Sequence, residues 1–549
     1  MGAHGGIPTQ SRRTVSRAVG TWMGMLFVLT VAPLYSQPVN VRISTPGGYP
    51  EETSIAINPT NPDNVIAGAN LRYYYWSTDG GLTWGESQLP PATYGDPCVV
   101  FGPDGRAYYA HLTVGWDAIT VRTSDDGGKT WSAGIKLRGP SSDSARPGPL
   151  TNSSLQDKEW LAADITGSRF RGNIYAAWTD FTRYGSANPR DSSVIVFARS
   201  TDRGETFEPF VRVSDTAGDA VDSDETMEGA VPAVGPEGEI YLAWAGPAGL
   251  YFDRSFDGGV TWGEDMIVSD MPGGWDIDIR GLQRANGLPV TMCDVSRGPY
   301  RGTVYVNWVD LRNGDPDVFI ARSTDRGATW SAPIRVNDDP LRNGKEQFFT
   351  WGTVDPVTGE IVIVFYDRRN YRTDSTDVYL ASSTDGGMTF VNRRINEAAF
   401  VPSAMVFMGD YNCVSAYGGR IRPIWTRLHG SDLSIHTAVI EGLTHSAVDA
   451  RIPATATVDA FPNPVTIASD YTTTIRFTAP EAGKTDIAVY DIAGRRIATV
   501  FEGWVEGGMT GWTFEAGTLP AGQYVIRAIR EGTSGQEARD ISSMMTVIK

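Results

Sequence analysis

The chain has 549 residues, with 47 basic and 64 acidic side chains and a net charge of −17. The residues after Ala454 carry 8 basic and 11 acidic side chains, so −14 of the charge lies before that point. This acidity argues against nucleic acid or an anionic membrane surface as a partner, because both repel a negatively charged protein. Length alone suggests three or four domains, but some β architectures run long as single units, so we expect two.

The first 36 residues have the features of a secretory signal peptide. Arg12, Arg13 and Arg17 give a positively charged segment, and residues 22–32 form a short apolar stretch behind it. An apolar run of this length favours a cleaved signal over a permanent membrane span. We therefore predict a signal peptide over residues 1–36, with a retained anchor as the alternative.

One eight-residue phrase, Ser-x-Asp-x-Gly-x-Thr-Trp/Phe, occurs six times between Ser77 and Phe390, at intervals of 47 to 76 residues. Its Asp can accept hydrogen bonds from nearby backbone amides, and its Ser and Thr hydroxyls can join the two ends of the same loop. Its Gly permits positive φ in a tight hairpin, and its final aromatic residue can fill the space between neighbouring sheets. We assign a structural role to the six acidic residues of the phrase, which are Asp79, Asp126, Asp202, Asp257, Asp325 and Asp385.

The spacing of these phrases suits one four-stranded blade of a β-propeller per repeat. Three further strand-like segments follow the sixth phrase without a seventh copy, and residues 39–44 resemble the missing outer strand. Pairing of this N-terminal segment with the last blade would leave no exposed edge. We predict an all-β protein with a propeller over residues 37–445, in which seven blades are favoured and six remain the alternative.

The repeated phrase identifies the resemblance: it is the Asp-box of the sialidase-like (BNR repeat) β-propellers. In that family the Asp-box lies on the loop between the third and fourth strands of a blade, away from the substrate. The Phe/Tyr-Arg-Ile-Pro signature that sialidases carry ahead of the first box is absent, and the nearest match is Val41-Arg42-Ile43-Ser44. The resemblance implies the fold, and it makes an exo-sialidase-like glycoside hydrolase one expectation for the activity.

A second repeated phrase follows the second strand of several blades. It is an Asp or Asn with an Arg two or three residues later, as in Asp310-Leu-Arg312. Because successive strands of a blade are antiparallel, these loops lie on the face opposite the Asp-boxes, together with the starts of the innermost strands. The loops place acidic and guanidinium side chains there, namely Asp180, Asp310, Asp367, Arg72, Arg183, Arg312 and Arg369. The starts of the innermost strands add Glu51, Glu52, Asp96, Asp157, Glu159, Glu225, Glu228, Asp276 and Tyr411.

Resemblance to sialidases implies what groups of these kinds would do, although the absent signature means that no role passes to an individual residue. Three arginines would clamp a sialic acid carboxylate, a Tyr beside a Glu would form the nucleophile pair, and an Asp would be the general acid/base. The catalytic candidates are Tyr411, Glu228 and Asp96, and the seven loop residues are the substrate-binding candidates. The alternative is that each Asp–Arg pair only braces its loop, which would leave a non-catalytic surface propeller that binds protein or polymer.

Few residues suggest a metal or a disulfide. Asp315, Asp317, Asp374 and Asp377 offer oxygen ligands that Ca²⁺ accepts, but without the order of an EF-hand loop. We predict no metal and no cofactor, with Ca²⁺ as the one candidate. The cysteines Cys98, Cys293 and Cys413 fall on innermost strands of different blades, too far apart for a disulfide, so we expect buried thiols.

A second domain follows a linker over residues 446–458. Short alternating strands predict a small β-sandwich over residues 459–549. Phe461-Pro-Asn-Pro464, Tyr490-Asp-x-x-Gly-Arg495 and Ala521-Gly-x-Tyr524 make this domain resemble the C-terminal sorting domain of the type nine secretion system. The resemblance implies export through the periplasm by that machinery to the outer cell surface or the medium. There the expected partner is an extracellular glycan or glycoprotein.

Overall fold

The computed structural model describes residues 1–2, 38–137, 154–442, 457–461, 465, 471–479, 483–505, 508–530 and 539–549. The expected signal peptide lies outside these residues except for Met1 and Gly2, and so does most of the expected linker. Contacts divide the chain into two units, Met1–Thr444 and His445–Lys549. The described residues form strands and turns without a helix, so none of their elements is a helical membrane span.

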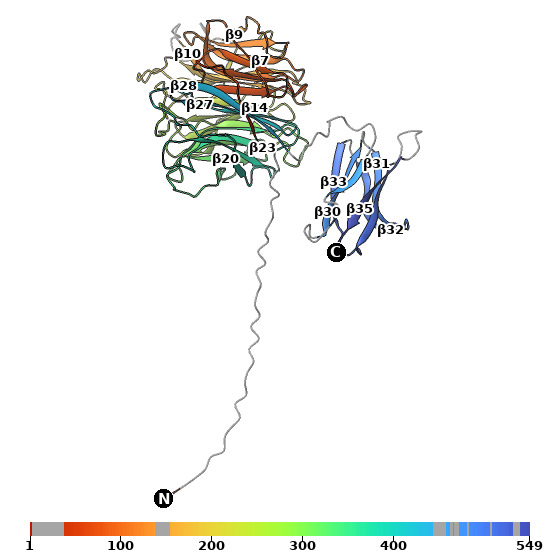
Figure 1. Ribbon diagram of the computed structural model, residues 1–549. Helices are drawn as coiled ribbons and strands as arrows, with labels where there is room; N and C mark the ends of the chain where they lie inside the picture. Colours follow the sequence, from red (N-terminus) through yellow and green to blue (C-terminus); the bar gives the residue numbers. More distant parts are fainter. Residues whose placement is uncertain are drawn as a thin grey trace. The chain divides into compact units, whose positions relative to one another are not determined.

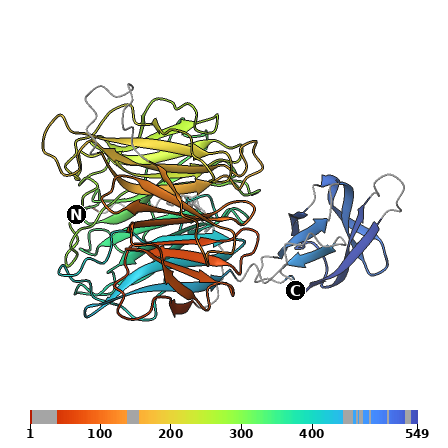
Figure 2. The same ribbon diagram turned by 90° about the horizontal axis from the view of Figure 1, so that it is seen from above.

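Seven four-stranded antiparallel sheets make up the described part of the first unit (Figures 1 and 2). Six of them follow the chain in order, strand by strand: β2 Thr53–Ile57, β3 Val65–Ala69, β4 Tyr73–Ser77 and β5 Gly85–Gln88; β6 Thr93–Phe101, β7 Ala107–Thr113, β8 Ile119–Ser124 and β9 Ile135–Leu137; β10 Leu155–Ala163, β11 Ile174–Phe181, β12 Ser193–Ser200 and β13 Val211–Arg212; β14 Glu228–Val234, β15 Ile240–Gly246, β16 Gly249–Ser255 and β17 Met266–Ser269; β18 Val290–Cys293, β19 Val304–Asp310, β20 Asp317–Ser323 and β21 Ile334–Arg335; β22 Gln347–Val354, β23 Ile361–Asp367, β24 Asp377–Ser383 and β25 Val391–Arg394.

The remaining sheet of this unit joins the two ends of its chain. It contains β26 (Cys413–Tyr417), β27 (Arg420–His429), β28 (Asp432–Glu441) and the N-terminal β1 (Val39–Arg42). β1 pairs antiparallel with β28, as the sequence predicted for the N-terminal segment. The first strands of the sheets contact one another in the order β2, β6, β10, β14, β18, β22 and β26, and β26 contacts β2. This closed cycle of contacts is consistent with a propeller.

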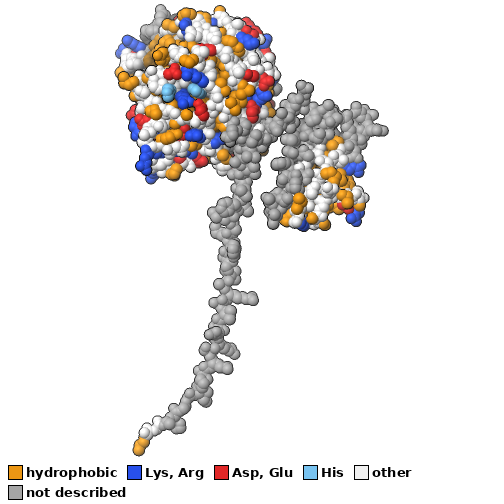
Figure 3. All heavy atoms as spheres, in the orientation of Figure 1, with side chains coloured by type: hydrophobic (Ala, Val, Ile, Leu, Met, Phe, Trp, Pro, Cys, Tyr) orange, Lys and Arg blue, Asp and Glu red, His pale blue; other side chains and the backbone are white. Residues whose placement is uncertain are grey.

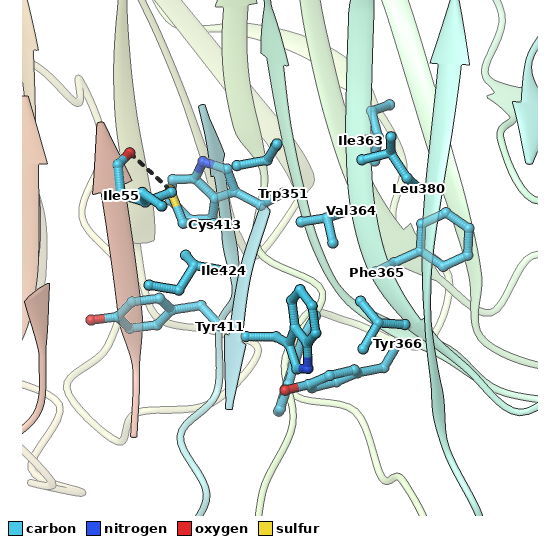
Figure 4. Packing of buried hydrophobic residues seen from close by; sticks show 14 of the residues in the cluster. Ile55, Trp351, Ile363, Val364, Phe365, Tyr366, Leu380, Tyr411, Cys413 and Ile424 are labelled. Atoms are coloured by element: carbon cyan, nitrogen blue, oxygen red, sulfur yellow. Dashed lines mark hydrogen bonds between the residues drawn. The ribbon is translucent and has the colours of Figure 1, made fainter. Parts of the chain in front are cut away.

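The second strands of the sheets are buried on both faces, whereas outer strands such as β5 and β25 are partly exposed. Every residue of the second strands β7, β11, β15, β19 and β23 is buried, because each sheet packs between two neighbours. Such strands become nearly continuous apolar runs, as in β23. Figure 4 shows Ile363, Val364 and Phe365 of β23 in the cluster that includes Ile424 of β27.

Each Asp-box forms the turn between the third and fourth strands of its sheet. In the first copy Ser77 Oγ donates to Asp79 Oδ1 at 2.8 Å, and the Gly81 amide donates to Ser77 Oγ at 2.8 Å. Thr83 closes the loop through its amide, 2.9 Å from Asp79 Oδ1, and its hydroxyl, 2.6 Å from Asp79 Oδ2. The same four kinds of bond occur in all six copies.

The last residue of the box fills the space between sheets. The ring centroid of Trp262 lies 4.9 Å from that of Phe197 in the preceding sheet, and Trp330 lies 4.9 Å from Phe252 in the same way.

The three cysteines are free and buried on β6, β18 and β26, as expected. Figure 4 shows Cys413 beside the carbonyl oxygen of Ile55, 4.0 Å from its Sγ.

The second unit contains two sheets among its described residues. One has three strands, β29 (Thr457–Phe461), β30 (Thr472–Ala479) and β33 (Gly508–Glu515); the other has four, β31 (Gly483–Asp491), β32 (Arg496–Val505), β34 (Gly522–Arg530) and β35 (Arg539–Val547). One hydrophobic cluster draws Phe477 from the first sheet and Val489 and Ile526 from the second. Residues 462–464 of the expected sorting motif lie outside the described residues.

Candidate functional site

The innermost strands begin at the end of the first unit opposite the Asp-boxes, and four of them begin with a β-bulge. The pairing register shifts between Gly95 and Cys98, Asp157 and Trp160, Glu228 and Val231, and Phe348 and Trp351. Just inside each shift stands a residue with positive φ: Asp96 at 54°, Lys158 at 53°, Gly229 at 80° and Phe349 at 52°. For residues other than Gly this conformation is strained, and it is commonest where structure re-aims a side chain at a functional site.

All four bulge residues line one cavity of about 30 Å³, which we call the entry cavity. Its lining residues are Asp96, Lys158, Glu159, Trp160, Gly229, Val231, Asn286, Leu288, Pro289, Phe349, Thr350, Trp351, Asp410 and Tyr411. A second space of about 60 Å³, the side cavity, shares Asp96, Lys158 and Asp410 with it and adds Asp157, Tyr184, Asp222, Glu228, Asp276 and Arg284.

An aromatic floor separates the entry cavity from an apolar space further along the inner strands. The ring centroids of Trp160 and Trp351 lie 4.2 Å apart, and both residues also line a cavity of about 270 Å³ bordered by Ile57, Phe101 and Cys413. Tyr411 packs against this floor, with its ring centroid 5.9 Å from that of Trp160 and 6.3 Å from that of Trp351. Figure 4 shows Tyr411 and Trp351 in this part of the core.

Two cations hold one carboxylate at the cavities. Lys158 Nζ lies 3.0 Å from Asp410 Oδ1, and Arg284 Nη2 lies 2.7 Å from Asp410 Oδ2 and 3.8 Å from Glu52 Oε1. Burial opposes ionisation of Asp410, but Lys158 and Arg284 outweigh it and lower its pKa to about 2. Asp410 is therefore ionised at neutral pH.

The pKa values of the neighbouring carboxyl groups are raised instead. Burial, aided by nearby acidic groups, raises the pKa of Glu51 to about 8 and raises the pKa values of Glu52, Asp157, Glu159 and Glu228 well above the usual range. The site thus places neutral carboxylic acids beside an ionised one. Paired acids whose pKa values are pushed apart in this way can act as a proton donor and a charged partner.

Several polar atoms of the site have no hydrogen-bond partner among the residues that the structure describes. Both carboxyl oxygens of Glu159, Oε2 of Glu228 and the hydroxyl of Tyr411 are buried without one. The side chains are well enclosed, since Glu159 is 1% exposed and Tyr411 is 6% exposed. Burial also raises the pKa of Tyr411, which keeps its phenol neutral. The hydroxyls of Tyr75, Tyr175 and Tyr241 elsewhere in the unit share this condition, so it does not by itself mark a ligand site.

The three catalytic candidates lie around these cavities. Asp96 and Tyr411 line the entry cavity, and Glu228 lines the side cavity with Asp96. The Tyr411 hydroxyl makes no hydrogen bond, so the Tyr–Glu bond of a nucleophile pair is not formed. Their catalytic roles stay predictions.

The four candidate arginines do not line either cavity. Arg312 Nε lies 2.9 Å from both carboxylate oxygens of Asp310, and Arg369 Nη2 lies 2.7 Å from Asp367 Oδ2. Arg183 is exposed and Arg72 is partly exposed. The substrate-clamp role of these arginines stays a prediction, and the contacts of Arg312 and Arg369 are those of the bracing alternative.

The acidic partners in these loops are buried and bonded. Asp180 Oδ1 accepts a hydrogen bond from Gln156 at 2.8 Å, and Asp310 Oδ2 accepts one from the Trp308 indole at 2.7 Å. Asp367 Oδ1 accepts one from the Arg369 amide at 2.7 Å. These bonds fix the ends of the second strands.

Sequence reasoning missed the two cations of the site. Lys158 stands between Asp157 and Glu159, which the sequence had singled out, so its position at a strand start was a usable signal. Arg284 lies in the connection between β17 and β18, where no repeated phrase marks it. Asp410, directly before the candidate Tyr411, was also not selected.

No group of three or more His, Cys, Asp or Glu within the described ranges is arranged to hold a metal ion. In the loops considered for Ca²⁺, carboxylates bind Arg and Asn side chains of the protein itself. Asp317 Oδ1 accepts hydrogen bonds from Arg335 at 2.8 Å and Asn337 at 2.6 Å, and Asp374 binds Arg280.

The BNR/Asp-box repeat model matches residues 122–133, which include the second of the six boxes. No curated protein matches the chain at a significant level. Among solved structures, the chain is similar to the Hadza microbial sialidase Hz136, with 15% identity, 69% of this chain and 73% of the other covered, and a TM-score of 0.40. It is also similar to the NanB sialidase of Streptococcus pneumoniae, with 9% identity, coverage of 69% and 84%, and a TM-score of 0.41. A third is the α-L-arabinanase of Penicillium chrysogenum, with 14% identity, coverage of 74% and 99%, and a TM-score of 0.39.

Proposed function

We propose that the first unit binds extracellular glycans on the surface over the entry cavity and the side cavity and hydrolyses a glycosidic bond there. The observation that carries this proposal is the ionised Asp410 beside buried neutral carboxyl groups above an aromatic floor. A carboxylic acid and a carboxylate on either side of a glycosidic bond are the usual equipment of glycoside hydrolysis, and aromatic rings offer apolar faces to a sugar.

The residues suggest a division of roles. We assign the acid/base role to Asp96 and the nucleophile role to Tyr411. Glu159, a neutral acid that lines the same cavity as Tyr411, is a second candidate for the proton donor. Lys158 lies 4.3 Å from the Tyr411 ring centroid, where its charge favours a phenolate during reaction.

Non-catalytic binding is the second candidate. The unformed bond between Tyr411 and an acidic partner favours it, because a nucleophile needs a base within hydrogen-bond reach. One experiment distinguishes hydrolysis from binding alone. The secreted protein is incubated with a panel of fluorogenic glycosides, a sialoside among them, and in parallel tested for binding to immobilised glycans.

Turnover that is lost in Tyr411→Phe, while glycan binding is kept, supports hydrolysis. Binding without turnover on any glycoside supports the second candidate. A protein that neither binds nor cleaves any glycan contradicts both.

We further infer that the seven sheets of the first unit are the blades of a seven-bladed propeller, and that the second unit is a β-sandwich sorting domain. Support for the latter comes from the turn after β31, where the Arg495 amide donates to Asp491 Oδ1 at 2.9 Å and Arg495 Nε donates to Asp491 Oδ2 at 2.7 Å. Gly494 in this turn has φ of 79°, which explains the Gly of the motif.

Such a domain would send the protein through the type nine secretion system to the outer surface or the medium. The test fuses residues 445–549 to a periplasmic reporter in a bacterium that has this system. The reporter should reach the surface or the medium, and a fusion with Gly494→Val should stay in the periplasm. Retention of both fusions in the periplasm would contradict the export proposal.

A further inference from the structure

Three aromatic side chains form a row that starts at the side cavity. Tyr184 lines that cavity, and the ring centroid of Trp116 lies 5.1 Å from that of Tyr184. The ring centroid of Tyr94 lies 5.4 Å from that of Trp116. Trp116 and Tyr184 are partly exposed, and Tyr94 is 39% exposed. These three residues, which we call the aromatic row, connect the side cavity with an exposed ring.

The backbone at the middle of the row is strained. Trp116 has φ of 57°, which is an outlier for a bulky residue. Backbone hydrogen bonds hold it there, since the Trp116 amide donates to the Thr113 carbonyl oxygen at 2.9 Å and the Gln156 amide donates to the Trp116 carbonyl oxygen at 2.8 Å. Strain of this kind persists only where the surroundings impose it, and it clusters at sites that bind a ligand. The loop therefore holds Trp116 in one backbone conformation before a ligand arrives.

Core packing accounts for only part of the row. Trp116 packs against the hydrophobic cluster of the second and third sheets, which includes Leu112 and Trp178. Tyr94 and Tyr184 belong to none of the hydrophobic clusters that the described residues form. The row thus keeps apolar surface in contact with water, and a ligand with apolar faces gains free energy by covering it.

The wall of the side cavity has partners for hydroxyl groups. Burial raises the pKa values of Asp157 and Glu228, so these groups are protonated and can donate, whereas Asp410 is ionised and can accept. A hydroxyl group both donates and accepts, so it suits this mixed wall. A sugar unit combines hydroxyl groups at its rim with apolar C–H faces that lie against aromatic rings. The row and the wall together therefore match a glycan.

We infer that the aromatic row is a subsite for a glycan chain, in which one sugar unit lies at the side cavity and the following units stack on Trp116 and Tyr94. This inference rests on the proposed function and names its substrate class, a chain of several units rather than a single terminal unit. The spacing of the rings is close to the length of one pyranose unit, so successive units of one chain meet successive rings. A proline-rich peptide also binds aromatic surfaces, but it has few groups for the wall of the side cavity.

The experiment measures the affinity of the full-length secreted protein for immobilised sugars of two lengths. The panel contains tetrasaccharides of glucose, galactose, xylose and N-acetylglucosamine and a sialylated tetrasaccharide, each beside its terminal monosaccharide, and a proline-rich peptide is a further probe. We expect at least one tetrasaccharide to bind about tenfold or more tightly than its monosaccharide, because only the longer ligand reaches Trp116 and Tyr94.

Substitutions in the row assign this difference to it. Trp116→Ala and Tyr94→Ala should each lower the affinity for that tetrasaccharide about tenfold, and Tyr94→Ala serves if Trp116→Ala does not fold. Trp116→Phe keeps an aromatic face and should retain most of the affinity. The matched control is Phe256→Ala, which removes a ring that is 50% exposed in an Asp-box at the opposite end of the sheets. The control should bind every ligand as the wild type does.

The outcomes separate this inference from the proposed function. Equal affinity for the two lengths, or a preference for the tetrasaccharide that Trp116→Ala and Tyr94→Ala both keep, overturns the role of the row and leaves the glycan site in place. Binding of the proline-rich peptide without binding of any glycan overturns the glycan as the ligand of the row. Failure of every glycan to bind overturns the proposed function and, with it, this inference.

Discussion

Lys158 Nζ lies 3.0 Å from Asp410 Oδ1, although the two residues are 252 positions apart in the chain. Lys158 lies in β10 and Asp410 lies just before β26, so the contact joins two sheets at the entry cavity. Arg284 binds the other oxygen of the same carboxylate. Lys158 and Arg284 therefore both hold Asp410 in place and keep it ionised.

Replacing Lys158 by Met should destabilise the first unit. Asp410 would keep only Arg284, and loss of one partner from a buried ion pair costs about 3 kcal/mol. Urea unfolding followed by tryptophan fluorescence measures the change. The control is Arg203→Met, whose bridge to Asp104 is 55% and 41% exposed and should contribute less than about 1 kcal/mol. Similar losses of unfolding free energy in the two variants would show that the Lys158–Asp410 pair contributes no more to stability than an exposed ion pair.

Stability should fall as pH rises from about 4.5 to about 8. Burial raises the folded-state pKa of Glu51 from 4.5 to about 8, so in this window the native protein holds a proton that the unfolded chain has lost. Unfolding is then favoured by higher pH, with a contribution from Glu51 of up to about 5 kcal/mol across the window. Other buried carboxyl groups of the site, such as Glu159, act in the same direction.

The free energy of unfolding, measured at a series of pH values, checks this slope. Glu51→Gln should flatten it, because the amide has no proton to lose, whereas the exposed Glu264→Gln should keep the wild-type slope. A wild-type slope in Glu51→Gln would mean that Glu51 is ionised in the folded state.

The repeated phrases predicted much of the fold because they act locally. The Asp-box closes within eight residues, and the N-terminal strand could be matched to β28 by its likeness to other outer strands. The site was harder to predict, because it depends on residues distant in sequence. Lys158, Arg284 and Asp410 come from three separate sheets or connections, and only folding brings them together. Bulges at Asp96 and Lys158 re-aim side chains in a way that periodicity does not reveal.

Arg312→Ala distinguishes a structural role of Arg312, in which it pairs with Asp310, from a role in binding a substrate carboxylate. Arg312 binds Asp310, which is buried, and its guanidinium carbon lies 4.8 Å from the Phe319 ring centroid. Its loss leaves the Asp310 charge unpaired, so we expect a loss of about 3 kcal/mol in stability. The affinity of the folded fraction for glycan should not change. Arg183→Ala, at an exposed position, is the control and should alter neither quantity. A large loss of sialoside binding with unchanged stability would instead support the clamp.

Asp325→Asn should weaken one sheet turn without touching the site. The Thr329 hydroxyl and the Ser323 hydroxyl donate to the Asp325 carboxylate at 2.6 and 2.7 Å, and together with the Thr329 amide they lower its pKa to about 2. An amide keeps one oxygen acceptor and turns the other into a donor that faces a hydroxyl, so we expect a loss of about 1–2 kcal/mol. Thr329→Val removes only one side-chain bond and should cost about half as much.

Both variants should bind glycan as the wild type does, because the Asp-boxes lie at the end of the sheets opposite the entry cavity. Unfolding curves and binding to immobilised glycans, measured for the two variants, test these effects. A change in glycan affinity in Asp325→Asn at full folding would contradict the separation of the two ends, on which the assignment of the entry cavity as the site depends.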